Sequence, residues 1–216
     1  MQLSLPVAVS LKSNLTTSGC GTERLCAAEP SGCDPASGSC FHTSVKRIGG
    51  FNHNFGLAGE SDGYLACALG PPNGGTQTVY VCVNRNGIVT FRSVSLTNGV
   101  FTNIKTPVTN VKAKVTGRRI QCEFSATIPN ATSTNRAADS TYTLGVLTGS
   151  VAADGTLGTP TTHVRTAPVD LTNPAANTNN TVSTTTAPTT TAGTAPLQSL
   201  SNALLIVFGV LSVSWL

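Results

Sequence analysis

The stretch Val111–Phe124, VKAKVTGRRIQCEF, decides the fold of this chain. On each side of Gly117–Arg118, apolar side chains alternate with polar ones. Because successive side chains of a strand point to opposite faces, each half presents one apolar face. The apolar positions are Val111, Ala113, Val115, Ile120, Cys122 and Phe124. The short Gly-containing link between the halves predicts a tight antiparallel hairpin that lies on a hydrophobic core.

Similar short runs recur along the chain, and helical periodicity is absent. They are separated by turn sequences such as PPNGG, NRNG, TNG and AADG. About eight strands without helices predict an all-β fold, an antiparallel β-sandwich or barrel. The expected strands are Cys40–Arg47, Gly63–Leu69, Thr78–Val83, Ile88–Val94, Val108–Thr116, Ile120–Ile128, Thr141–Leu147 and Thr162–Leu171.

Composition narrows the functional classes. The 216 residues include 10% charged residues and carry a net charge of +4. This charge is small and scattered, and no Lys/Arg-rich run occurs, so we expect no nucleic-acid partner. The nucleophile elbow G-x-S-x-G and the zinc-protease motif H-E-x-x-H are both absent, which disfavours an enzyme without excluding one.

Seven cysteines indicate an oxidising compartment. Cys20, Cys26, Cys33 and Cys40 cluster near the start of the chain without the close pairs typical of zinc sites, so disulfides are favoured over zinc. They would staple a loop-rich N-terminal segment to the sandwich, and Cys82 and Cys122 are natural partners for that segment. Six cysteines allow 15 pairings, and the sequence does not choose among them. The remaining Cys67 is expected to be a buried, inert thiol.

The C-terminal part differs sharply from the rest, since no charged residue follows Asp170. Residues 172–195 are rich in Thr, Pro, Ala and Asn and are typical of a glycosylated stalk, the alternative being a plain linker. Residues 196–216 comprise a polar spacer and an apolar run, ALLIVFGVLSVSWL, which is shorter than the roughly 20 residues of a membrane-spanning helix. This pattern predicts a glycosylphosphatidylinositol (GPI) signal with attachment at Gly193 or Ala192. A short tail anchor or a buried terminal helix is the alternative.

The opposite end is less informative. Residues 1–15 form a weak or incomplete signal segment, which leaves residues 16–171 as the folded domain. Sequons at Asn14, Asn130 and Asn179 are compatible with secretion. Together these features predict a glycoprotein on the extracellular face of the plasma membrane.

Four motifs, in order, suggest a family: CGTERLCAAEPSGCDPASGSC, GESDGYLACALG, TVYVCVNRNG and GRRIQCEF. This succession resembles the DOMON domain of the ferric-chelate reductase 1 family, and the likeness covers about Cys20–Leu171. It implies a β-sandwich of the DOMON type, a fold used outside cells to bind haem or sugars. Family members also carry a cytochrome b561 membrane module, and no segment of this sequence resembles it, so the chain would not be a self-sufficient ferric-chelate reductase.

The resemblance also suggests where haem would bind. Haem-binding members use a Met and a His as axial ligands, and the matching His here is His163. The Met position corresponds to Gly74, so the expected haem ligation is degenerate. Haem b would then need another ligand, and His42 and His53 are the remaining histidines. From the residues alone we expect His42 at the solvent or at a turn, and His53 in a loop.

The sequence therefore predicts a cell-surface module, held by a lipid anchor, that binds an unidentified extracellular ligand or surface protein. The alternative is a haem b electron-transfer domain that works with a separate membrane redox partner.

Overall fold

A computed structural model describes residues 7–128 and 140–182. The sequon at Asn130, the proposed attachment sites Ala192 and Gly193, and the apolar run 203–216 lie outside the described residues. The described part contains no helix long and apolar enough to cross a membrane.

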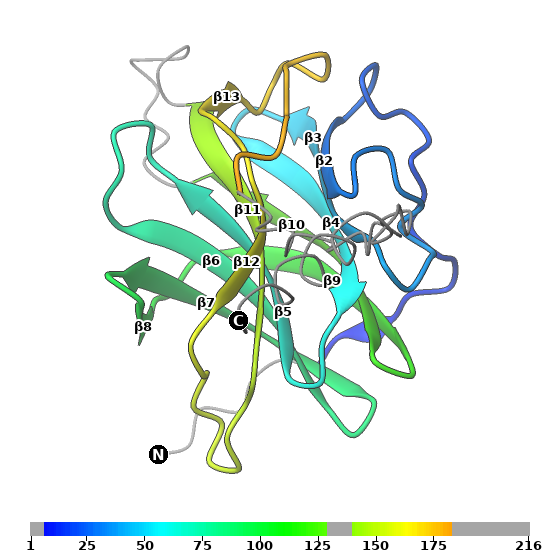
Figure 1. Ribbon diagram of the computed structural model, residues 1–216, viewed down its shortest axis with the longest axis vertical. Helices are drawn as coiled ribbons and strands as arrows, with labels where there is room; N and C mark the ends of the chain where they lie inside the picture. Colours follow the sequence, from blue (N-terminus) through cyan, green and yellow to red (C-terminus); the bar gives the residue numbers. More distant parts are fainter. Residues whose placement is uncertain (1–6, 129–139, 183–216) are drawn as a thin grey trace, which may run out of the picture. The chain divides into compact units, whose positions relative to one another are not determined.

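Two β-sheets face each other and form a sandwich, which confirms the predicted fold class (Figure 1). All strand pairs are antiparallel except the β1–β9 pair, which is parallel. The first sheet has the order β1 (Val9–Ser10), β9 (Val108–Thr116), β10 (Arg119–Thr127), β4 (Asn52–Glu60), β3 (Phe41–Gly49) and β2 (Leu25–Glu29). The second has the order β12 (Thr161–Arg165), β11 (Thr141–Gly149), β5 (Tyr64–Gly70), β6 (Gln77–Arg85), β7 (Ile88–Thr97) and β8 (Val100–Asn103). A short strand, β13 (Val169–Asp170), also pairs with β11.

The predicted hairpin forms as β9 and β10. Cys122 lies opposite Ala113 and Ile120 lies opposite Val115, so the apolar positions share the core face. Gly117 adopts a φ of 59°, a left-handed conformation that glycine tolerates best and that tight hairpin turns require. The alternating pattern and the turn residue therefore agree on one register.

Most expected strands appear with small changes at their ends, but the last one is divided. The expected run Thr162–Leu171 is broken into β12 and β13 around Pro168, which has no N–H to donate to a strand ladder. Four strands were not expected: β1, β2, β4 and β8. Of these, β4 is a central strand between β3 and β10.

The core between the sheets contains a cluster of aromatic rings. Phe55 and Phe124 stack with ring centroids 5.1 Å apart, and Tyr80 and Phe91 pack against Phe124 from the other sheet. Beside them, Cys82 of β6 and Cys122 of β10 form a disulfide between the two sheets. These two cysteines are therefore partners of each other and not of the N-terminal segment, because facing positions place their Cα atoms 6.7 Å apart.

Both ends of the described chain extend beyond the expected domain of residues 16–171. Val9 and Ser10 pair with β9, and Leu11 is buried, so residues 7–11 of the expected signal segment belong to the sandwich. At the other end, hydrogen bonds to the sandwich continue as far as Thr181, within the expected stalk.

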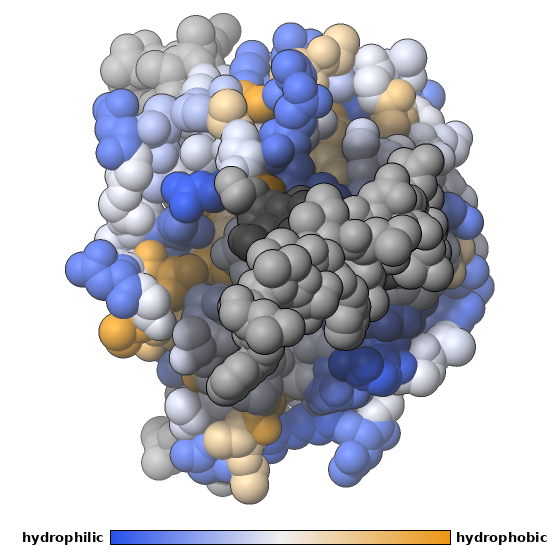
Figure 2. Space-filling view, viewed as in Figure 1, coloured by the Kyte–Doolittle hydropathy of each residue, from blue (hydrophilic) through white to orange (hydrophobic). Residues whose placement is uncertain are grey.

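The surface seen in Figure 2 is mainly hydrophilic around its rim, with small separate hydrophobic patches. The large apolar side chains most exposed in the described part are likewise scattered over different strands. Single exposed apolar residues are ordinary in globular domains.

Candidate functional site

A loop-rich segment, residues 12–40, lies against the outer face of the first sheet. We call it the cysteine-rich segment; it contains β2, which pairs with β3. Two disulfides close loops within it, Cys20–Cys26 and Cys33–Cys40. Disulfides are thus formed at the four clustered cysteines, as predicted, although they join neighbours in sequence and do not link the segment to the sandwich.

The outer face beneath this segment is polar yet buried. Gln121 of β10 is 3% exposed, and its side-chain oxygen accepts a hydrogen bond of 2.7 Å from the Leu15 backbone N–H. Leu15 also packs over Gly56 of β4, where an added Cβ would be in ordinary contact with both Leu15 methyl carbons at 3.6 Å. The segment therefore covers a face that a sandwich usually leaves to solvent.

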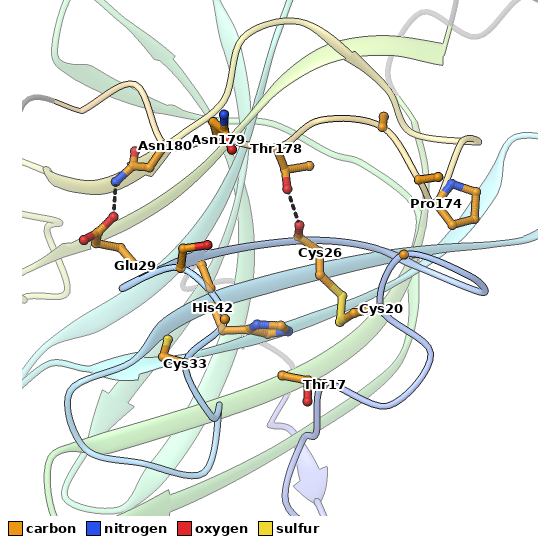
Figure 3. A pocket seen from close by; sticks show the side chains of 16 residues that line it. Thr17, Cys20, Cys26, Glu29, Cys33, His42, Pro174, Thr178, Asn179 and Asn180 are labelled. Atoms are coloured by element: carbon orange, nitrogen blue, oxygen red, sulfur yellow. Dashed lines mark hydrogen bonds between the residues drawn. A yellow bond between two sulfur atoms is a disulfide. The ribbon is translucent and has the colours of Figure 1, made fainter.

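A cavity of about 820 Å³ opens where this segment meets the chain after β13 (Figure 3). Its walls come from three parts of the sequence: the cysteine-rich segment, β3 and residues 174–180. The polar side chains that line it are Thr17, Glu29, Ser31, His42, Thr178, Asn179 and Asn180. A volume of this size is typical of small-molecule sites.

His42 is the buried polar group of the cavity wall. It projects from β3 on the side opposite Thr43 and Val45, toward the Cys20–Cys26 disulfide (Figure 3). Its side chain is 1% exposed, and neither ring nitrogen has a hydrogen-bond partner. The expectation of a solvent-facing or turn-capping His42 is therefore wrong, because the cysteine-rich segment covers this face of β3.

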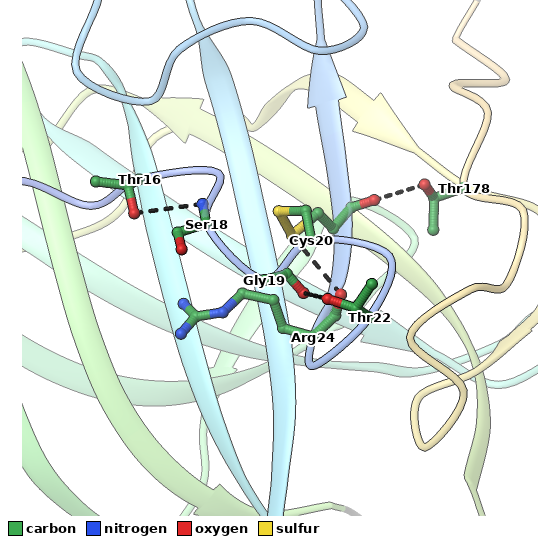
Figure 4. Close-up of a disulfide and its surroundings, with 8 residues drawn as sticks. Thr16, Ser18, Gly19, Cys20, Thr22, Arg24 and Thr178 are labelled. Atoms are coloured by element: carbon green, nitrogen blue, oxygen red, sulfur yellow. Dashed lines mark hydrogen bonds between the residues drawn. A yellow bond between two sulfur atoms is a disulfide. The ribbon is translucent and has the colours of Figure 1, made fainter.

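The surroundings keep the His42 imidazole neutral. Burial and, to a smaller extent, the nearby charge of Arg24 lower its pKa to about 4, and Asp34 opposes the shift. Arg24 follows the Cys20 loop, which is held by hydrogen bonds to Gly19 (Figure 4). A neutral imidazole offers one donor and one acceptor nitrogen, so His42 can serve as either toward a bound group.

Residues 174–182 form the opposite wall, and we call them the C-terminal strap. Thr178 donates to the Cys26 carbonyl at 2.5 Å. The Asn180 amide donates to Glu29 at 2.8 Å and to the His163 carbonyl at 2.9 Å, and its oxygen accepts from the Arg165 N–H at 2.9 Å. The strap thereby joins β2 of the first sheet to β12 of the second.

His163, the residue matched to a haem ligand, lies outside this cavity lining. Its ring stacks on Phe41 at 3.6 Å, and its Nε2 is 2.7 Å from the Thr148 hydroxyl. Burial lowers its pKa. Thr148 takes the direction along Nε2 in which iron would bind, so these surroundings do not fit a haem ligand.

The other two positions considered for haem, Gly74 and His53, lie at different sheets of the sandwich. Gly74 lies in an exposed turn between β5 and β6, whereas His163 lies on β12, beyond β11. His53 is buried on β4 and not in a loop, and its Nδ1 is 3.0 Å from the Phe51 carbonyl oxygen. In the described residues, the contacts of the His163 ring are with Phe41 and Thr148.

Three further expected sites can be located. Cys67 is buried on β5 without a disulfide, and its Sγ lies 3.6 Å from the Thr43 hydroxyl. The side chains of Asn14 and Asn179 are exposed, as a glycan acceptor needs to be. Sequence reasoning missed the cavity, because its walls come from segments about 130 residues apart and no local pattern marks their meeting.

The fold and the cavity together define a disulfide-stapled β-sandwich with a polar cavity at one edge. No protein-family model matches the chain. A Danio rerio protein named "Putative ferric-chelate reductase 1" is 27% identical over 169 residues, covering 72% of this chain and 28% of that protein. The chain thus spans little more than a quarter of this relative's length, and the likeness supports a distant relationship to that family.

Proposed function

We propose that this protein is a cell-surface binding module of the DOMON type, and that the cavity beside His42 is its ligand site. The observation that carries the proposal is the buried imidazole of His42, whose two nitrogens have no partner in the protein. A buried polar group without a hydrogen bond is unfavourable by about 1–3 kcal/mol, and a bound ligand would remove that penalty.

The lining indicates a polar and uncharged ligand. Amide, hydroxyl and neutral imidazole groups surround the cavity, and its one carboxylate, Glu29, already accepts from Asn180. Such groups hydrogen-bond hydroxyls, so a saccharide fits this site. The DOMON likeness, through which sugars enter as a ligand class, agrees with this reading of the cavity.

NMR of the imidazole nitrogens tests the proposal directly. The ¹⁵N signals of His42 are followed while neutral mono- and oligosaccharides are added to the oxidised protein. We expect a saturable shift at His42 and at least about a fivefold loss of affinity in His42→Ala, which corresponds to about 1 kcal/mol. His163→Ala is the matched control and should bind normally. If no saccharide of the panel shifts the His42 signals, the assigned ligand class is wrong.

The same proposal places the protein on the outer face of the plasma membrane through a lipid anchor. Three disulfides and two exposed sequons suit a secreted domain. Phospholipase C specific for phosphatidylinositol should release the protein from cells, and replacing both Ala192 and Gly193 by bulky residues should prevent anchoring. Retention on the cell surface after the enzyme treatment would contradict the anchor.

A haem titration separates this proposal from the electron-transfer alternative. The absorption spectrum of the secreted protein should show no saturable Soret band, because Thr148 occupies His163 Nε2. A band that saturates at one haem per chain and disappears in His163→Ala would overturn that expectation and favour the redox function.

A further inference from the structure

Three groups of metal-ligand type meet at the cavity wall. The Sγ atoms of Cys20 and Cys26 and one ring nitrogen of His42 all lie within 4.8 Å of one another. In the oxidised protein the two sulfurs are joined in a disulfide, and as such they are poor metal ligands. Reduction of this disulfide would give two cysteine thiols, and their thiolates are good metal ligands.

His42 supplies an independent sign that a ligand belongs here. It is a buried histidine beside the disulfide with both nitrogens unpartnered, on the wall of an open cavity. The His42 ring nitrogen forms a close cluster with the sulfurs of Cys20 and Cys26. The second disulfide of the cysteine-rich segment, Cys33–Cys40, is not part of this cluster. The arrangement is therefore specific to one of two similar disulfides.

We propose that reduction of Cys20–Cys26 by a dithiol creates a binding site for a thiolate-seeking metal ion such as Zn²⁺, with Cys20, Cys26 and His42 as ligands. The site uses the same cavity as the proposed ligand binding but does not depend on it.

The chemistry balances in two steps. A dithiol attacks the Cys20–Cys26 bond, its own two sulfurs become a disulfide, and its two protons pass to the Cys20 and Cys26 thiols. Binding of the metal then displaces both protons to solvent, because thiolates are the ligating form.

The geometry needs only side-chain adjustment. Tetrahedral zinc, with bonds of about 2.3 Å to sulfur and about 2.0 Å to nitrogen, separates its ligand atoms by roughly 3.5–3.8 Å. One His42 ring nitrogen already lies within 4.8 Å of both sulfurs, and the two sulfurs, which are bonded to each other at present, move apart once the disulfide is reduced. Three protein ligands leave a fourth position for water from the cavity, the pattern of open zinc sites.

The two cysteines are also accessible to the reductant. Both line the cavity and are partly exposed. The disulfide that they form is drawn in Figures 3 and 4. The inter-sheet pair Cys82–Cys122 is completely buried and should survive mild reduction. Cys67 is a free thiol but is also completely buried, so it should not be labelled in the native protein.

Cobalt(II) is a suitable probe, because its thiolate complexes absorb in the near ultraviolet and its tetrahedral complexes absorb strongly in the visible. The full chain carrying Cys33→Ser and Cys40→Ser is treated with a dithiol without oxygen, freed of reductant and titrated with Co²⁺. Labelling should count two new thiols. We expect both absorptions at one ion per chain, displacement by Zn²⁺, and no such absorption before reduction.

Two variants decide the role of each ligand. His42→Gln should weaken Co²⁺ binding at least about tenfold, while a chain with Cys20→Ser and Cys26→Ser, which keeps Cys33–Cys40, should lose the charge-transfer absorption. Circular dichroism verifies that each variant is folded. Two reactive thiols without cobalt absorption, or equal affinity in folded His42→Gln, would overturn the proposal. The saccharide test uses the oxidised protein, so either proposal can fail alone.

Discussion

At the scale of single residues, His42 shows how far surroundings can move a side chain from its ordinary behaviour. The sequence places it in a strand, where a polar residue next to Phe41 and Thr43 would ordinarily face water. The structure buries it because a remote segment covers that face. Its ring is buried beside the charge of Arg24, and both conditions lower its pKa. Neither ring nitrogen has a hydrogen-bond partner.

This burial should make stability depend on pH between about 4 and 6.5. The folded pKa of His42 is about 4, below its ordinary 6.5, so the unfolded chain binds more protons in this range and stability falls as the pH falls. We expect His42 to account for a loss of about 2.5 kcal/mol between pH 7.5 and 4.5. Urea unfolding of the wild type and of His42→Gln measures this loss, which the variant should lack. Equal losses in both would contradict the assignment.

Cys67 should be chemically silent in the folded protein. It is fully buried, and burial raises its pKa to about 12, so the reactive thiolate is scarce and inaccessible. Iodoacetamide should leave the native protein unlabelled and add one group per chain in denaturant without reductant. Mass spectrometry reads the label, and Cys67→Ala, which should stay unlabelled in denaturant, identifies the site. Fast native labelling at Cys67 would count against this placement.

At the scale of elements, the hairpin β9–β10 was predictable because its alternation, its turn and its register carry the same information. Strand β4, NHNFGLAGE, was not predictable. Its Gly56 and Gly59 weaken any strand pattern, yet an added Cβ at Gly59 would come within 2.8 Å of Phe41 and Leu65. Glycine at position 59 leaves space for the Phe41 and Leu65 side chains, and a single sequence does not reveal which side chains will pack there.

The same limit applies to the disulfides and to the candidate site. The seven cysteines made disulfides predictable, but the pairing of Cys82 with Cys122 depends on which strands of the two sheets face each other. His42, Asn180 and Thr17 meet only in three dimensions, and nothing local to any of them signals the cavity.

Removing different disulfides should have unequal effects. Cys82–Cys122 spans 40 residues, whereas Cys33–Cys40 spans 7. In the loop-entropy view, the first stabilises by about 4 kcal/mol and the second by about 2.5 kcal/mol. Urea unfolding of the two double Cys→Ala variants should therefore give the larger loss for the inter-sheet pair. A larger loss for Cys33–Cys40 would show that strain or local contacts dominate the chain-entropy effect.

At the scale of the whole molecule, the sandwich has one edge where β2 of one sheet lies near β12 of the other. Phe41 stacks on His163 across this edge, and the C-terminal strap closes it from outside. This structural role of residues 174–182 was not predictable, because their composition is typical of a stalk. The first residues of a polar, proline-containing stretch can still be ordered when their side chains satisfy the backbone of a neighbouring edge strand.

Asn180 makes three of the hydrogen bonds of this closure, since its side-chain amide bonds to Glu29, to the His163 carbonyl and to the Arg165 N–H. We expect Asn180→Ala to lower the free energy of unfolding by about 2 kcal/mol and to speed hydrogen exchange at Arg165, because those bonds are lost together. The sequon at Asn179 survives this change. Asn173→Ala is the control. The Asn173 side chain accepts a local bond from the Ala175 N–H, and its removal should change stability by less than about 0.5 kcal/mol. Equal effects in the two variants would mean that the strap lies on the sandwich without holding its edge closed.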